Sequence, residues 1–228
     1  MNRGQFSAQL NEIQAILKRV DLYRDRNYVP EYQRVSAAEF RHLDYFEVWQ
    51  KSFRENYYDF QLIDDALLSF RVDNFEPLNI SYSYYECPYE MAMSFDEYLQ
   101  KQIGFSAEDI SNYDVNPLDE SDFYDSQPLK YSITPIRYDY SPQLYTSGRH
   151  PASHIHFGFN THIRVGTKKI LQPKAFLFFV IRQFYPDNWV THCTQMEEGM
   201  IRRTVRDSLG NIEDAHFGGL DLCEMYLN

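Results

Sequence analysis

Residues 131–159 read YSITPIRYDYSPQLYTSGRHPASHIHFGF. They contain two separate segments in which polar and apolar residues alternate. Alternation with a period of two is typical of a β-strand that has one buried face. It predicts strands at Tyr131–Tyr140 and Ser153–Phe159, and a shorter strand follows at His162–Val165. Pro135 has no backbone N–H, so it indicates a sheet edge or a bulge at that position.

The same alternation places a group of polar side chains together. His154 and His156 share one face of their strand, while the apolar residues beside them face the core. Arg137 and Asp139 share one face of the preceding strand by the same parity. Successive strands often pair in antiparallel fashion, so we expect these four side chains to converge, with His150 close by.

The sequence before this stretch predicts two helices followed by a hairpin. The Ser36-Ala37-Ala38-Glu39 capping box opens the second helix, and an Asp64-Asp65 corner separates the two arms of the hairpin. The expected elements are helices at 6–24 and about 36–54, strands at 59–63, 66–73 and 79–86, and a short helix at 94–103 that Ser94 opens.

The sequence after this stretch predicts a buried helix. Residues 174–184 are apolar on nearly every face, and Pro173 suits the first helical turn. A helix that is apolar all round is expected to lie against the sheet. A helical turn near Trp189 and a helix at Met196–Arg206 should follow.

These elements define an α+β fold: an antiparallel sheet of about five or six strands, N-terminal helices and one buried helix packed on the sheet. The 228 residues fit one domain. Its parts are a helical N-terminal part at 1–56 and a sheet-containing core at 57–228, with an acidic connection at 104–129. Aromatic residues make up 17% of the chain, which favours a ring-rich core and excludes overall disorder.

The formal charge of −11 disfavours an extended basic surface that binds many phosphates of a nucleic acid, but a small basic pocket is compatible with it. The three widely spaced cysteines form no paired metal motif and no disulfide framework, which favours a reducing cytoplasm. The longest apolar run, 175–181, is far shorter than the ~20 residues that cross a bilayer, so we expect no membrane association.

Residues 102–129 contain no Lys or Arg and seven acidic residues. We favour a solvated connection for this segment, because charge runs usually lie in water. The alternative is a flap that mimics nucleic acid or holds a basic partner.

Three mechanisms could use the candidate group. The first is metal-free attack on a phosphodiester, with His154 and His156 as the acid/base pair. Arg137 would hold a phosphate oxygen, and Asp139 would orient an imidazole.

The second mechanism is a zinc-type site, in which the two strand histidines take His150 or Asp139 as third ligand. The third is binding alone of a phosphate or carboxylate by Arg137, Arg164 and the imidazoles. We assign no metal ligand and no cofactor from the sequence, although zinc or another divalent metal suits the second mechanism.

Structural roles compete with these functional ones. Arg137 and Asp139 would also form an ordinary salt bridge across a sheet. We favour a solvated helix face for Arg202, Arg203 and Arg206. No glycine-rich phosphate loop, Gly-x-Ser-x-Gly elbow or His-Glu-x-x-His helix is present.

The order of several motifs resembles a known family. They are IRYD at 136–139, HPASHIHFG at 150–158, RV at 164–165, LQPKAF at 171–176 and FYP at 184–186. Together they resemble the bacterial domain of unknown function 2290. The resemblance implies a prokaryotic, soluble, single-domain protein with no established activity, from mobile-element or antiviral gene clusters. The Arg-x-Asp strand and histidines are also similar in outline to small bacterial toxins suspected of RNase activity.

From these observations we expect a phosphodiesterase that acts on RNA or another nucleotide, with catalytic Arg137, Asp139, His150, His154 and His156 and substrate-binding Arg164. The alternative is a non-catalytic adaptor or regulatory subunit in a multi-gene system, which would bind a protein partner through its acidic, aromatic-rich surface.

Overall fold

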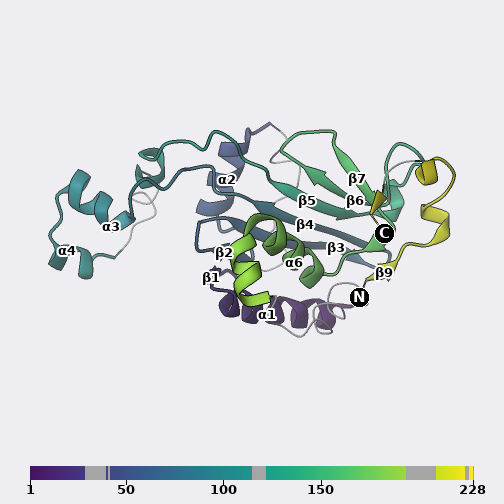
Figure 1. The fold of residues 1–228 in the computed structure, drawn as a ribbon, viewed down its shortest axis with the longest axis horizontal. Helices are drawn as coiled ribbons and strands as arrows, with labels where there is room; N and C mark the ends of the chain where they lie inside the picture. The colour runs from purple at the N-terminus through teal and green to yellow at the C-terminus, as the bar shows by residue number, and fades with distance from the viewer. Residues whose placement is uncertain (29–39, 41, 115–121, 194–208, 224–225, 228) are drawn as a thin grey trace.

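The computed structural model describes residues 1–28, 40, 42–114, 122–193, 209–223 and 226–227. Within them, eight strands form one sheet in the order β1-β2-β3-β4-β5-β6-β7-β10 (Figure 1). Neighbouring strands are antiparallel, except that β10 runs parallel to β7. The strands are β1 (Tyr23–Arg26), β2 (Phe60–Leu62), β3 (Leu67–Phe75), β4 (Leu78–Tyr85), β5 (Ile136–Tyr140), β6 (Ser153–Phe157), β7 (Arg164–Thr167) and β10 (Tyr226–Leu227).

This architecture confirms the α+β class and corrects the strand count. The six strands expected from alternation are all present. The described part of the chain adds the short strands β1 and β10 to this sheet, and two more short strands, β8 (Lys169–Ile170) and β9 (Gly210–Asn211), form a separate antiparallel pair. Residues 131–135 are not part of a strand, because β5 begins only after Pro135. The Pro135 carbonyl instead accepts a hydrogen bond from the Gly158 N–H, just beyond β6.

One face of the sheet is apolar and is covered by helix α6 (Pro173–Phe184) and helix α1 (Arg3–Arg19) (Figure 1). The Phe176 ring lies 6.0 Å from Phe70 and 5.8 Å from Tyr82, both from central strands. The prediction of a buried helix on the sheet is therefore confirmed. Burial of such rings contributes roughly 1.5–3 kcal/mol each to folding.

Helix α1 begins after a capping box formed by Asn2 and Gln5. The prediction that this helix continues to residue 24 is wrong, because Asp21 adopts a positive φ of 55° and the chain turns into β1. Val20 and Leu22 extend the apolar pattern, but they enter the core from the turn rather than from the helix.

Helix α2 (Tyr45–Arg54) is capped by Asp44 and Glu47, which form a capping box. The expected helix start at 36–39 lies outside the described residues, and residues 40 and 43 precede the helix. α2 contributes to a second core at one end of the sheet. This core contains Trp49, Tyr58, Leu67, Cys87, Tyr89, Tyr98, Leu99, Phe123 and Tyr124.

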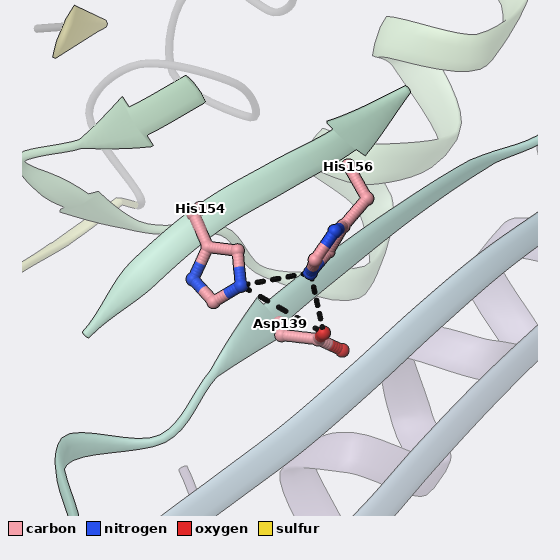
Figure 2. A group of neighbouring side chains, drawn as sticks. All are labelled: Asp139, His154 and His156. Carbon is pink, nitrogen blue, oxygen red and sulfur yellow. Dashed lines mark hydrogen bonds and ion pairs between the residues drawn. The ribbon is translucent and has the colours of Figure 1, made fainter. Parts of the chain in front are cut away.

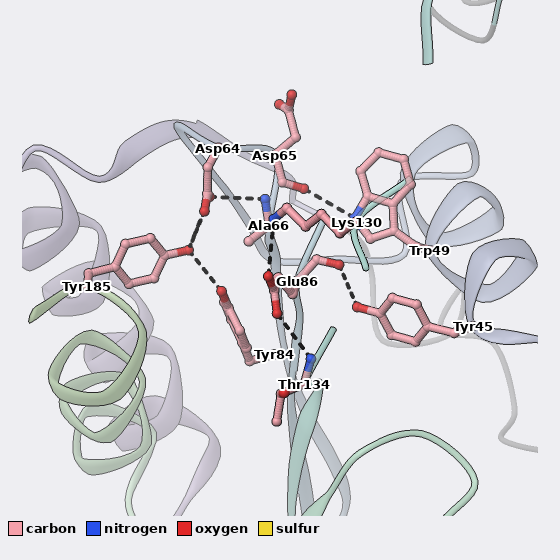
Figure 3. A network of polar contacts seen from close by, with 10 residues as sticks. All are labelled: Tyr45, Trp49, Asp64, Asp65, Ala66, Tyr84, Glu86, Lys130, Thr134 and Tyr185. Atoms are coloured by element: carbon pink, nitrogen blue, oxygen red, sulfur yellow. Dashed lines mark hydrogen bonds and ion pairs between the residues drawn. The ribbon is translucent and has the colours of Figure 1, made fainter. Parts of the chain in front are cut away.

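A network of polar contacts joins this end of the sheet (Figure 3). Tyr185, at the end of α6, donates to the Asp64 carboxylate at 3.0 Å and lies 3.1 Å from the Tyr84 hydroxyl. Trp49 Nε1 donates to the Asp65 carbonyl at 3.2 Å. These contacts fix α2 and α6 to the turn between β2 and β3.

The same network continues to the chain that leads into β5. Glu86, which follows β4, accepts from Lys130 Nζ and from the Thr134 N–H, each at 3.1 Å, and its carbonyl accepts from the Tyr45 hydroxyl (Figure 3). β5 therefore starts from a fixed position.

The remaining elements are short. Helix α3 (Phe95–Tyr98), the π-helical turn η2 (Leu99–Ile103) and helix α4 (Ala107–Ser111) extend away from the sheet, and Ser94 caps α3 as expected (Figure 1). Helix α7 (Pro186–Asn188) and the π-helical turn η4 (Trp189–Cys193) confirm the expected turn near Trp189. The others are η3 (Pro142–Leu144), β8 (Lys169–Ile170), β9 (Gly210–Asn211), η6 (Asp214–His216) and η7 (Gly219–Cys223).

Two further expectations concern helices: one was expected near the C-terminus, and none was expected to cross a membrane. The helix expected at 196–206 lies outside the described residues. Among the described helices, none combines the length and the hydrophobicity that crossing a bilayer requires.

Candidate functional site

The second face of the sheet is polar, and the strand register places the candidate residues side by side on it. Asp139 on β5 pairs with His154 on β6, and Arg137 pairs with His156. Arg164 on β7 pairs with His156 from the other side. Arg137, His156 and Arg164 therefore form one row across three strands.

Four of these side chains are in direct contact. Arg137 Nε lies 2.9 Å from Asp139 Oδ2, and Arg137 Nη2 lies 3.2 Å from His156 Nε2. His156 Nε2 lies 3.2 Å from Asp139 Oδ2 and 2.9 Å from His154 Nε2 (Figure 2). The structure thus brings together the four residues that strand parity predicts.

Asp139 carries a stable negative charge. Burial alone would raise its pKa, but the hydrogen bond from His156, the charge of Arg137 and the Ser81 hydroxyl together hold the pKa well below its usual range. Ser81 Oγ donates to Asp139 Oδ1 at 2.7 Å, which leaves Oδ2 for Arg137 and the imidazoles. Ser81 was missed in the sequence, although the alternation in β4 places it on this face.

His154 is the most enclosed member, with 1% of its surface exposed. Its Nδ1 lies 2.8 Å from the Pro151 carbonyl, which can only accept, so Nδ1 carries the hydrogen. Burial, followed by the charge of His156, lowers the pKa of His154 to about 4. The ring is therefore neutral at pH 7, and its Nε2 lone pair faces His156 and Asp139.

His150 lies in a tight turn before β6. Backbone hydrogen bonds between Thr146 and His150 close this turn. The His150 ring lies 4.9 Å from the His154 ring, and its buried Nδ1 has no hydrogen-bond partner within the described chain. Burial, followed by the charges of Arg164 and His156, lowers the pKa of His150.

A cavity of about 500 Å³ opens above this polar face. Arg137, Asp139, His150, His156 and Arg164 line it, whereas His154 lies behind them. Sequence reasoning missed several further lining residues. Tyr57, Arg71 and Tyr85 come from distant segments, whereas Ser141, Phe159 and Asn160 lie just beyond β5 and β6.

Two further histidines, His162 and His192, do not line this cavity. His162 is exposed, and His192 forms an ion pair with Asp21 at 3.2 Å, beside α1. Gly158 has a φ of +80°, and an added Cβ there would lie 2.9 Å from Thr161 Cγ2. This glycine therefore serves the turn between β6 and β7.

Asp139, His154 and His156 also have the donor atoms of a metal site. One oxygen and two ring nitrogens lie within 4.8 Å of one another, and they form the one such group among the described residues. Two imidazole nitrogens with a carboxylate oxygen suit a divalent transition metal.

Comparison with known proteins gives one match. No curated protein and no solved structure matches the chain significantly. A family model described as "Uncharacterized conserved protein (DUF2290)" matches residues 19–216, which is most of the 228 residues and includes every residue of the candidate site. The chain belongs to the DUF2290 family.

Proposed function

We propose that this protein hydrolyses phosphodiester bonds in RNA or another nucleotide within the cavity on the polar face of the sheet. The supporting observation is the row of Arg137, His156 and Arg164, which places an imidazole between two guanidinium groups beside the Asp139 carboxylate. Arginine is well suited to hold phosphate oxygens, because its planar fork donates two parallel hydrogen bonds.

Arg137 and Arg164 are close enough for both side chains to contact one phosphate group. Adjacent strands are about 4.8 Å apart, so the Cα atoms of Arg137 and Arg164 lie roughly 10 Å apart across β6. Arg137 has 48% of its side chain exposed, and Arg164 is exposed on the edge of the cavity and forms no ion pair within the described chain. Both side chains can reach a phosphate that lies above His156.

Aromatic rings at the cavity support a nucleotide rather than free phosphate. Phe40, Tyr57, Tyr85 and Phe159 line the cavity and are half-buried. Rings that are partly exposed beside cationic groups are typical of sites where bases stack. A small or single-stranded substrate also agrees with the charge of −11, because few phosphates need neutralising.

Two buried polar atoms on the cavity wall favour a polar ligand. His150 Nδ1 and Ser141 Oγ have no hydrogen-bond partner within the described chain. Unsatisfied buried polar groups cost about 1–3 kcal/mol each, so a ligand that bonds to them binds more tightly.

The geometry also bears on the three mechanisms. A metal-free acid/base pair needs two imidazoles that each reach the substrate. His154 does not line the cavity, and its two nitrogens face Pro151 and His156. The arrangement therefore favours His154 as a positioning residue over His154 as an acid or base.

The test is cleavage of short, labelled single-stranded RNA and DNA, and of an activated phosphodiester, by the purified chain. We expect His156→Ala and Arg137→Gln to lower kcat/KM at least 100-fold, because each removes a group at the reacting phosphate. His162→Ala, which changes an exposed histidine outside the cavity, is the matched control. Absence of turnover on every phosphodiester, or full activity in His156→Ala, would exclude this function.

A second function is favoured by the projecting segment. α3, η2 and α4 extend from the sheet (Figure 1). A shallow hollow there is lined by Phe105, Glu108, Asp109, Asn112, Tyr113 and Asp114. We propose, as the alternative, that this acidic and aromatic surface holds a basic protein partner. Charge reversal by Glu108→Lys with Asp109→Lys should abolish partner capture without changing hydrolysis, and unchanged capture would contradict it.

A further inference from the structure

We propose that Asp139, His154 and His156 bind one divalent transition-metal ion, and that zinc suits this donor set best. The binding of the ion is argued from the three side chains alone. Its use in catalysis rests on the proposed function.

The three donor atoms form a small triangle (Figure 2). Its sides are 2.9 Å between the two Nε2 atoms, 3.2 Å from His156 Nε2 to Asp139 Oδ2, and 3.9 Å from His154 Nε2 to the same oxygen. A circle through three such points has a radius of about 2.0 Å, and zinc bonds to nitrogen and oxygen are about 2.0–2.2 Å long. One ion therefore fits at bonding distance from all three atoms.

Hydrogen bonds alone do not satisfy the neighbours of His156 Nε2. This nitrogen faces His154 Nε2, Asp139 Oδ2 and the Arg137 Nη2 donor. A ring nitrogen either donates one hydrogen or accepts one, so it cannot donate to Asp139 and accept from Arg137 together. A cation accepts the lone pairs of all three donor atoms, and Arg137 keeps its 2.9 Å contact between Nε and Asp139 Oδ2.

The contacts behind the donors are those expected around a metal ion. His154 donates Nδ1–H to the Pro151 carbonyl, which directs the Nε2 lone pair to the centre of the triangle. Ser81 Oγ donates to Asp139 Oδ1 and so fixes Oδ2. Metal-bound histidines and carboxylates almost always make such outer contacts, which orient the ligand.

The site would be open on one side. His156 and Asp139 line the cavity, whereas His154 closes the other side. Three protein ligands with one open position are the arrangement of catalytic rather than structural zinc. A water molecule bound there would lose a proton more readily, and its oxygen would attack phosphorus as the bond to the leaving oxygen breaks and that oxygen takes up a proton.

The test is direct binding of metal to the full chain after treatment with a chelator. We expect calorimetry to give one Zn²⁺ per chain and Co²⁺ to give the visible absorption of a four-coordinate site, while Mg²⁺ does not bind. His154→Ala and Asp139→Asn should lower Zn²⁺ affinity at least 100-fold. His162→Ala is the matched control, because it removes an exposed histidine of the same region.

The proposal remains testable if a variant of one of the three ligand residues fails to fold. Ser81→Ala keeps all three ligands and should lower Zn²⁺ affinity about 10–100-fold through the outer contact alone. Zn²⁺ should also raise the Tm of the natural protein and of His162→Ala. No stoichiometric ion, or equal Zn²⁺ affinity in His154→Ala and His162→Ala, would overturn the proposal.

Arg164→Gln separates this inference from the proposed function. It removes a phosphate contact without touching a ligand, so Zn²⁺ affinity should persist while cleavage falls. If the protein binds Zn²⁺ but cleaves no phosphodiester, the metal site is supported and the proposed hydrolase function is excluded. Full cleavage by metal-stripped protein keeps the hydrolase and excludes a catalytic use of the ion, whereas Zn²⁺ affinity alone decides whether the metal site exists.

Discussion

At the scale of single residues, Asp139 is the centre of the polar face. Its two oxygens contact Ser81, Arg137 and both histidines of β6. Parity along two strands was sufficient to predict four of these five residues. The depth of His154 could not be predicted, because it depends on how Pro151 and the His150 turn cover the end of β6.

Replacing Ser81 tests how strongly Asp139 is held. Ser81→Ala removes the hydrogen bond to Asp139 Oδ1 and should lower the free energy of unfolding by about 1–2 kcal/mol, because a partly buried carboxylate oxygen loses its partner. Urea denaturation measures the change. Ser83→Ala is the matched control on the same strand and face, since the Ser83 hydroxyl forms no hydrogen bond within the described chain. Equal losses in the two variants would contradict the prediction.

At the scale of elements, periodicity predicted the central strands and α6, while the ends of elements were the main errors. Helix α1 stops at Arg19 because Asp21 takes a left-handed conformation, and nothing in the apolar spacing marks that change. β5 starts late because Pro135 lacks the N–H that a strand residue would donate. Turn geometry and backbone donors therefore set the ends of these elements.

The turn between β6 and β7 depends on Gly158. Gly158→Ala forces a side chain into a φ of +80° and to within 2.9 Å of Thr161 Cγ2, so both strain and crowding destabilise the fold. Gly104 has a φ of +85° with nothing near its added Cβ, so Gly104→Ala is the matched control. We expect a loss of about 1–2 kcal/mol for Gly104→Ala and more for Gly158→Ala, measured by thermal unfolding. A smaller loss at Gly158 would show that crowding does not matter there.

The turn that carries His150 depends on Asp221, in η7. The Asp221 carboxylate accepts from the Gly148 N–H at 3.0 Å, from the Gly218 N–H at 3.2 Å and from the Tyr145 hydroxyl. Burial would raise the pKa of Asp221, but these hydrogen bonds outweigh it and lower the pKa.

A lowered pKa in the folded chain means that Asp221 stabilises the fold above its unfolded pKa, near 3.8. This stabilisation is lost as the pH falls through the folded pKa. Asp221→Asn should therefore be less stable than the natural protein at pH 7, and the difference should shrink below about pH 4. Urea denaturation at several pH values measures it. A difference that is the same at pH 7 and pH 3 would contradict this linkage.

At the scale of the whole molecule, the sheet separates two environments. Aromatic rings and α6 cover one face, and the polar cavity opens on the other, with the second aromatic core at one end. Composition predicted the ring-rich core. The parallel pairing of β10 with β7 joins segments far apart in the sequence, and two residues of strand carry too little periodicity to be recognised.

The net negative charge of the chain predicts that its affinity for RNA depends only weakly on salt concentration. If Arg137 and Arg164 are the main phosphate contacts, two charges are neutralised, and log affinity against log salt should have a slope of about −1.4 for a single strand. Fluorescence anisotropy of a short labelled RNA at several salt concentrations measures it, and Arg137→Gln should halve the slope. A slope of about −4 or steeper would indicate a broad basic surface, against the charge of −11.

The ladder of β5 and β6 has a consequence for how the protein tolerates change. Backbone pairing alone sets Asp139 opposite His154 and Arg137 opposite His156. A single residue inserted within either strand would move the side chains that follow it to the opposite face of the sheet. Apolar rings would then be exposed to water, and charged side chains would be buried. We therefore expect changes of length to be tolerated only in the connecting loops. A deletion scan should find folded protein for deletions in the loops and loss of the fold for single deletions within β5 or β6.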